Sequence, residues 1–104
     1  MKAQFLINKF YIYRIEVVDM QKFIYTITDP QGLHARPAGL LVKCAQKCTS
    51  SVQMAANGHS ADAKSILAVM GLGVTKNNEI TFSVEGASEA KDAAALKDFC
   101  EKNL

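Results

Sequence analysis

The stretch Gly32-Leu33-His34-Ala35-Arg36-Pro37-Ala38 places a histidine at the start of a predicted helix. Proline suits the first turn of a helix, where its missing N–H would have no partner anyway. From Ala38 onward, apolar residues recur at helical spacing and polar residues fall on the other faces, which predicts an amphipathic helix over about residues 35–47. One face of this helix should therefore pack against the core of the domain.

The start of this helix is suited to holding an anion. The first N–H groups of a helix have no partner within it, and the aligned peptide dipoles place about half a positive charge there. This charge favours a neutral, nucleophilic imidazole at His34. Backbone donors and Arg36 could then hold a phosphoryl group transferred to that ring. The residues alone also allow an ordinary surface histidine at this position.

In three other segments every second residue is apolar, which is typical of strands with one buried face. Their apolar members are Phe23, Tyr25 and Ile27, then Val52, Met54 and Ala56, then Ile80, Phe82 and Val84. Asn57-Gly58 predicts a tight hairpin, followed by a weak strand over about residues 59–63 at an edge of the sheet. We assign no chemistry to His59, which follows that turn.

Two more helices complete the pattern. Ser65 can cap a short helix over residues 66–70, and Ser88 can cap a last helix whose buried face includes Ala93, Leu96 and Cys100. The order is strand, helix, two strands, short helix, strand, helix, which favours an antiparallel sheet with its helices on one side. The pattern also permits a ferredoxin-like arrangement.

Composition limits the classes of function. A chain of 104 residues suits one domain. Its net charge is only +2 and its lysines are scattered, so we expect no nucleic-acid partner. A metal site would need more ligands than Cys44 and Cys48, and neither histidine is beside them in sequence, so we expect no metal. We interpret these thiols as small core residues in a reducing cytosol, with oxidation of the pair as the alternative.

Residues 1–19 differ in character from the rest of the chain. Lys9 and Arg14 interrupt their apolar runs, which are then too short for a signal peptide or a membrane span, so we expect no membrane insertion. We expect a leader over residues 1–19 that is foreign to the domain, and a domain over residues 20–104. An extra strand or a partner-binding arm is the alternative.

The stretch at residues 32–38, followed by Lys64-Ser65-Ile66-Leu67-Ala68-Val69-Met70-Gly71-Leu72-Gly73, resembles HPr, the histidine phosphocarrier of the bacterial sugar phosphotransferase system. The resemblance runs from about residue 20 to residue 104. It implies an α+β fold, the open-faced β-sandwich, in which a four-stranded antiparallel sheet carries three helices on one face. Gln31 departs from the family pattern, which often has Ser, Thr or Asn there, and so does Gly71, where Ser is common.

The resemblance also implies a function. His34 would accept a phosphoryl group on its δ nitrogen from phosphorylated enzyme I and pass it to an enzyme IIA. Arg36 would neutralise the charge of the phosphate. Such a protein is a cytoplasmic, monomeric carrier more than a turnover enzyme, and it needs no cofactor of its own.

The second motif implies two further roles. Ile66, Leu67 and Met70 would form an apolar patch on which partner proteins dock, although the pattern alone also fits a short core helix. Ser65 resembles the regulatory serine that HPr kinase/phosphorylase modifies, although it could be only a helix cap. The alternatives are a regulatory paralogue that acts through a transcription regulator, and a nitrogen-branch carrier with the same chemistry. An enzyme that uses the thiols of Cys44 and Cys48 is a remote third.

Overall fold

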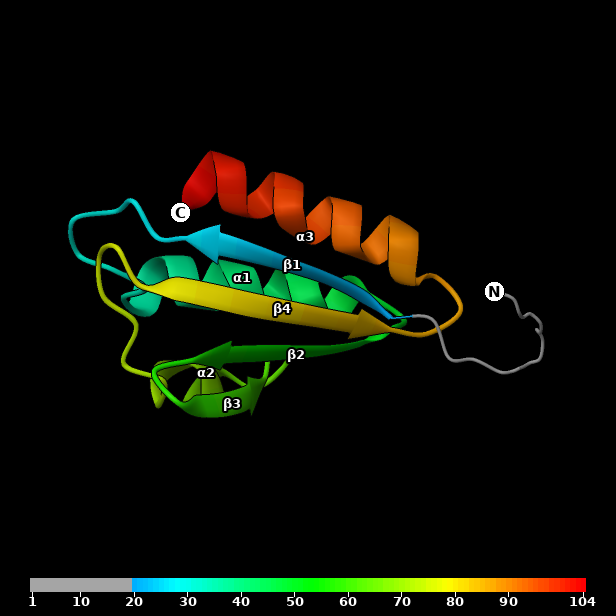
Figure 1. Ribbon diagram of the computed structural model, residues 1–104, viewed down its shortest axis with the longest axis horizontal. Helices are drawn as coiled ribbons and strands as arrows, with labels where there is room; N and C mark the ends of the chain where they lie inside the picture. Colours follow the sequence, from blue (N-terminus) through cyan, green and yellow to red (C-terminus); the bar gives the residue numbers. More distant parts are fainter. Residues whose placement is uncertain (1–19) are drawn as a thin grey trace, which may run out of the picture.

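The computed structural model describes residues 20–104, so the predicted leader over residues 1–19 lies outside the described residues. The elements in chain order are β1 (Gln21–Thr26), α1 (Ala35–Lys47), β2 (Ser51–Ala56), β3 (His59–Asp62), α2 (Ile66–Met70), β4 (Glu79–Glu85) and α3 (Glu89–Asn103). The four strands form one sheet in the order β1-β4-β2-β3, and every neighbouring pair is antiparallel (Figure 1).

The helices cover one face of this sheet and leave the other open, which confirms the predicted open-faced β-sandwich. The ferredoxin-like arrangement that the pattern also permitted is not adopted, because β1 lies at an edge beside β4, and β2 lies between β4 and β3. The weak strand β3 is the other edge, as predicted, and spans four residues.

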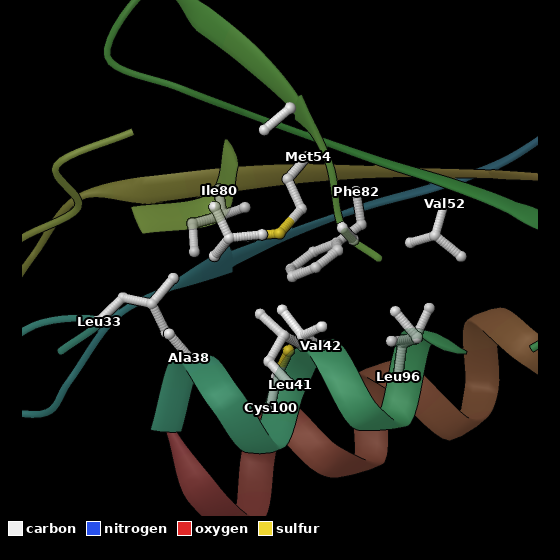
Figure 2. Packing of buried hydrophobic residues seen from close by; sticks show 14 of the residues in the cluster. Leu33, Ala38, Leu41, Val42, Val52, Met54, Ile80, Phe82, Leu96 and Cys100 are labelled. Carbon is white, nitrogen blue, oxygen red and sulfur yellow. The ribbon is translucent and has the colours of Figure 1, made fainter. Parts of the chain in front are cut away.

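The core lies between the sheet and the helices. Figure 2 shows side chains of β2 and β4 facing those of α1 and α3, with Leu33 at one end of the cluster. Phe82 of β4 is fully buried, and Phe23 of β1 stacks on it with ring centroids 4.8 Å apart. Leu41 of α1 and Leu96 of α3 are also fully buried, so the predicted apolar faces are confirmed.

The hairpin between β2 and β3 has the predicted turn. Asn57 and Gly58 have φ values of +53° and +79°, the left-handed pair that a tight two-residue hairpin requires. The Asn57 side chain has a second task, because its Nδ2 donates to the carbonyls of Leu72 and Gly73 at 3.0 and 3.2 Å. The turn of the hairpin thereby holds the chain that follows α2.

The two predicted serine caps have different outcomes. Ser65 Oγ accepts from the amide of Ala68 at 3.3 Å, so this cap is confirmed. Ser88 occupies the N-cap position of α3, but its side chain makes no capping hydrogen bond, so that prediction is wrong. Its ψ of 25° is not the extended conformation of an N-cap. Instead, Glu89 Oε1 accepts from the amide of Gly86 at 3.1 Å.

A glycine brings the loop before α1 against the chain that follows α2. Gly32 has a φ of +68°, and a Cβ at this position would lie 2.6 Å from the Val74 carbonyl oxygen. The next residue, Leu33, donates its amide to that same oxygen at 3.1 Å and is buried. This close approach of two backbones fixes the direction from which the chain enters α1 at His34.

Candidate functional site

His34 is the N-cap of α1 and leaves its side chain free for chemistry. Its φ and ψ are −81° and 180°, its carbonyl accepts from the amide of Ala38 at 3.0 Å, and its side chain makes no capping hydrogen bond. The imidazole is 38% exposed. The prediction that a histidine stands at the start of this helix is therefore confirmed, and the ring is accessible from solvent.

The first turn of α1 offers donors and no competing negative charge. Because Pro37 has no N–H, the amides that lack a partner within the helix are those of Ala35 and Arg36. The first turn contains no acidic residue, so the helix itself places no negative charge at its positive end. The exposed Arg36 adds a full positive charge at this end.

The imidazole and the arginine share one cavity. Its volume is about 380 Å³, and it is lined by Asp29, His34, Arg36, Pro37 and Leu40, together with Lys102 and Asn103 from the end of α3. The structure thus brings together both residues that the sequence predicts for phosphoryl transfer. A cavity of this size at the surface, with two cations and two open amides, can hold a phosphoryl group.

Asp29 is a member of this site that the sequence analysis missed. Its Oδ2 lies 3.6 Å from Nε2 of His34, and its side chain is 30% exposed. Its Oδ1 accepts from the amide of Gln31 at 2.9 Å, a local turn that holds the carboxylate. The turn residues were visible in the sequence, but nothing local shows that the carboxylate meets the imidazole.

Lys102 was also missed. It reaches the cavity from the last turn of α3 and pairs with the carboxylate of Asp98 at 3.1 Å, with both side chains more than half exposed. An exposed pair of this kind contributes little to stability, so the ammonium group remains available to an anion in the cavity. No local signal places residue 102 beside residue 34, because only the packing of α3 on the sheet does so.

The short helix α2 presents the predicted apolar residues to solvent. Ile66, Leu67 and Met70 are 41%, 84% and 40% exposed, whereas Val69 is buried beneath them. Helix α2 packs against α1, on which Leu40 is 43% exposed and lines the cavity of His34. We call Ile66, Leu67, Met70 and Leu40 the apolar patch. Leu40 was not predicted as part of it.

Ser65 lies half-buried at the start of α2, and its neighbour is tied to α1. The ammonium nitrogen of Lys64 donates to the carbonyl of Cys48 at 3.0 Å, and the Lys64 carbonyl accepts from Nε2 of Gln46 at 3.1 Å. The serine hydroxyl accepts a hydrogen bond within α2, as described above. A modification of this hydroxyl would therefore act at the junction of α1, α2 and the apolar patch.

The three cysteines are free thiols. Burial raises the pKa of Cys48 to about 11 and that of Cys100 to about 12. Burial also raises the pKa of Cys44. Raised pKa values mean that little thiolate is present near neutral pH, which is the opposite of what a nucleophilic or redox-active cysteine needs. This geometry favours the interpretation of the thiols as packing residues.

The rest of the described chain offers less. A hollow of about 420 Å³ on the sheet is lined by residues of β2, β3 and β4 with the hairpin turn, His59 among them, and contains none of the site residues. Residues 20–104 contain no cluster of three His, Cys, Asp or Glu side chains that could hold a metal ion. Within the same range, no helix is long and apolar enough to cross a membrane.

Comparisons with known proteins agree on one family. The family model for the PTS HPr component phosphorylation site matches residues 21–102. The phosphocarrier protein HPr of Mycoplasma genitalium is 42% identical over 85 residues, which are 81% of this chain and 97% of that protein.

Solved structures agree with the sequence comparison. The histidine-containing phosphocarrier protein of a mycoplasma is 38% identical with a TM-score of 0.74, and the match covers 76% of this chain and 90% of that protein. HPr from Thermoanaerobacter tengcongensis is 36% identical with a TM-score of 0.76, and the match covers 80% of this chain and 93% of that protein.

Proposed function

The chain belongs to the HPr phosphocarrier family of the phosphotransferase system, and on that premise we propose that His34 is the residue that carries the phosphoryl group. The observation that supports this most directly is the position of the imidazole. It is the N-cap of α1, with its side chain uncapped, accessible and in one cavity with Arg36. No other histidine of the described chain lies at the start of a helix, because His59 is in strand β3.

The proposed step is a transfer of phosphorus from enzyme I to a nitrogen of His34. The lone pair of His34 Nδ1 attacks the phosphoryl group of phosphorylated enzyme I, which has drawn it from phosphoenolpyruvate. A new N–P bond forms on His34, the bond between phosphorus and the donor atom of enzyme I breaks, and its electron pair returns to that atom. Arg36 and the open amides of α1 hold the negative oxygens during the transfer.

We propose that the apolar patch binds the donor enzyme I and the acceptor enzyme IIA in turn. Its four side chains are apolar and exposed, Met70 is unbranched and can repack against different partners, and Leu67 is the most exposed of the four. A small patch also favours a weak complex that dissociates quickly, as a carrier requires. The carrier would act in the cytoplasm as a monomer.

We further propose that Ser65 is a regulatory phosphorylation site for an HPr kinase/phosphorylase. A phosphoserine adds a charge of about −1.5 to −2, which is tolerated at the start of a helix but opposes docking on an adjacent apolar surface. Phosphotransfer from enzyme I to Ser65→Asp should therefore be slower than to wild type, whereas Ser65→Ala should lose only the cap. Undiminished transfer to Ser65→Asp would refute this regulatory role.

The experiment that tests the main proposal is incubation with enzyme I, Mg²⁺ and phosphoenolpyruvate, followed by intact-mass measurement. We expect one acid-labile phosphate on wild type and none on His34→Ala. His59→Ala is the matched control, because it removes the only other histidine and should still be phosphorylated. A phosphate that persists on His34→Ala would overturn the assignment.

We infer that the carrier domain comprises residues 20–104. A chain that begins at Met20 should accept phosphate at the rate of the full chain. A loss of transfer on this truncation would give residues 1–19 a part in function.

A further inference from the structure

We propose that Asp29 is a positioning residue, whose carboxylate keeps the proton of the neutral His34 ring on Nε2 and so leaves the lone pair on Nδ1. This inference rests on the proposed function, because it concerns how the same imidazole accepts phosphorus. A neutral imidazole carries one proton on either of its two nitrogens, and only the nitrogen without it can attack. The partner of one nitrogen therefore selects the nucleophile.

The geometry assigns this partner to Nε2. Asp29 Oδ2 lies 3.6 Å from that nitrogen, which is longer than a hydrogen bond but close enough for a charge to orient an N–H dipole. Hydrogen bonds of a catalytic group are often long in the free protein and shorten in the complex with the reacting partner. A small rotation of the exposed imidazole would close this distance.

The carboxylate is held in place from several sides. Oδ1 accepts from the amide of Gln31 at 2.9 Å, so Oδ2 is the oxygen that faces the ring. The Asp29 amide donates to the carbonyl of Leu104 at 3.2 Å, and the Asp29 carbonyl accepts from the amide of Gly32 at 2.8 Å. These bonds fix the aspartate relative to the histidine five positions later.

Among the described residues that line the cavity, the side chain of Asp29 suits this role best. The charged groups in the lining are Asp29, Arg36 and Lys102, and both cations are donors that cannot accept a hydrogen bond from the imidazole. The side chain of Asn103, which donates through its Nδ2 to the carbonyl of Phe99 at 3.0 Å, is uncharged, so its oxygen attracts an N–H group less strongly than a carboxylate does. Asp29 is the one carboxylate among the residues that line this cavity.

The same carboxylate assists both directions of transfer. When Nδ1 gains phosphorus, the Nε2–H bond stays intact and the ring acquires a positive charge, which the carboxylate of Asp29 balances. When the phosphoryl group leaves for the next acceptor, the N–P electron pair returns to Nδ1 and the ring departs as a neutral imidazole. Without the Nε2 proton the leaving group would be an imidazolate anion, which is a much poorer one.

The decisive variant is Asp29→Asn. Its Oδ1 still accepts from the Gln31 amide, but it presents an N–H group to the ring, which favours the proton on Nδ1 instead. In a buried catalytic triad the same exchange costs about 10⁴-fold in rate, and here, with both groups partly exposed, we expect roughly a tenfold slower phosphorylation by enzyme I. Glu85→Gln is the control, because it also removes one carboxylate. Glu85 ends β4 beside the start of β1, whereas the segment that carries Asp29 and His34 follows the other end of β1, which pairs with Glu79.

Two readouts separate this role from a structural one. Nitrogen-15 spectra of the neutral, unphosphorylated ring should show the proton mainly on Nε2 in wild type and Glu85→Gln, and shifted towards Nδ1 in Asp29→Asn. Asp29→Ala should give an intermediate ratio, which keeps the test informative if Asp29→Asn folds poorly. The rate of phosphorylation should follow the same order.

Each outcome decides a separate point. An unchanged proton ratio in both variants would overturn the inference, and so would a changed ratio with an unchanged rate of phosphorylation. If wild type accepts no phosphate from enzyme I, the proposed function fails instead. The nitrogen-15 spectra then still show whether Asp29 places the proton.

Discussion

The ammonium nitrogen of Lys64 donates to the backbone carbonyl of Cys48 at 3.0 Å, across 16 positions of the chain. The carbonyl of the same lysine accepts from Nε2 of Gln46 at 3.1 Å. The residue that precedes Ser65 is therefore joined twice to the end of α1. The start of α2, and with it the apolar patch, is held relative to the helix that begins at His34.

Replacing this lysine should loosen that junction. Lys64→Met keeps the length of the side chain and removes its donor, so we expect the free energy of unfolding to fall by about 1 kcal/mol, the usual worth of one hydrogen bond. Urea unfolding followed by circular dichroism measures it. Lys43→Met, at an exposed position of α1, should change stability by less than half as much. Equal losses of stability in Lys64→Met and Lys43→Met would contradict the proposal that Lys64 stabilises this junction.

Replacing each of two adjacent leucines of α1 with alanine should lower stability by very different amounts. Leu41 is fully buried in the core, whereas Leu40 is 43% exposed. Leu41→Ala should cost about 2–5 kcal/mol of stability, because it removes apolar contacts and leaves a cavity. Leu40→Ala should cost less than about 1 kcal/mol. Thermal and urea unfolding of both variants test this contrast, and similar losses would mean that the helix faces the sheet differently.

Leu67 should matter for transfer without affecting stability. Its side chain is 84% exposed, so Leu67→Ser should leave the urea midpoint unchanged. We expect the KM of enzyme I for the carrier to rise roughly tenfold, because a few side chains carry most of the binding energy of an interface and Leu67 is the most exposed side chain of the patch. Ile24→Ser is the matched control, since Ile24 is 61% exposed on β1, where the core-facing neighbours are Phe23 and Tyr25. A KM that rises equally in both variants would place docking elsewhere.

Asp92 should make stability depend on pH. Hydrogen bonding from Ser50, whose amide donates to Oδ2 at 3.1 Å, holds the pKa of Asp92 below its ordinary value of 3.8. A lowered pKa in the folded state means that this stabilisation is complete above the unfolded value and is lost as the pH falls through the folded one.

Asp92→Asn should therefore be less stable than wild type at neutral pH, and the two curves of unfolding free energy should converge below about pH 4. Urea unfolding at a series of pH values measures this. Asp98→Asn, which removes an exposed carboxylate of the same helix, should change stability by less than about 1 kcal/mol at neutral pH. A gap between wild type and Asp92→Asn that stays constant down to low pH would contradict the account.

The thiols should resist modification in the folded protein. Because burial raises the pKa of Cys48 to about 11 and that of Cys100 to about 12, iodoacetamide at pH 8 should alkylate both very slowly. After unfolding in urea, all three cysteines should react within the same time. Peptide mass spectrometry distinguishes the sites. Rapid labelling of Cys48 in the native protein would reopen a redox role for the pair with Cys44.

The features that the sequence predicted correctly are those that local residues determine. The start of α1 at His34, the cap at Ser65 and the turn at Asn57-Gly58 each depend on residues within a few positions. Ser88 shows the limit of such reasoning, because its residue type suits a cap but its backbone does not adopt the cap conformation. The hydrogen bond at this end of α3 is made by the next residue instead, because the Glu89 carboxylate accepts from the amide of Gly86.

The features that the sequence did not predict come from distant segments. Lys102 enters the cavity of His34 only because α3 packs beside β1, and Asp92 is buried because it meets Ser50, 42 positions earlier. Asp29 is close to His34 in sequence, yet its carboxylate faces the ring through a turn that Gln31, Gly32 and Leu104 fix together. Spacing alone carries no information on such contacts.

The carbonyl of Leu104 accepts hydrogen bonds from the amides of Thr28 and Asp29 and from the Thr28 hydroxyl, which closes a loop of 76 positions. Closing so long a loop costs chain entropy, which only the contacts formed at its two ends can offset. During synthesis on the ribosome, a growing chain therefore cannot hold the segment that carries Asp29 in its final place until residue 104 has left the exit tunnel. Nascent chains should be poor acceptors of phosphate up to that moment.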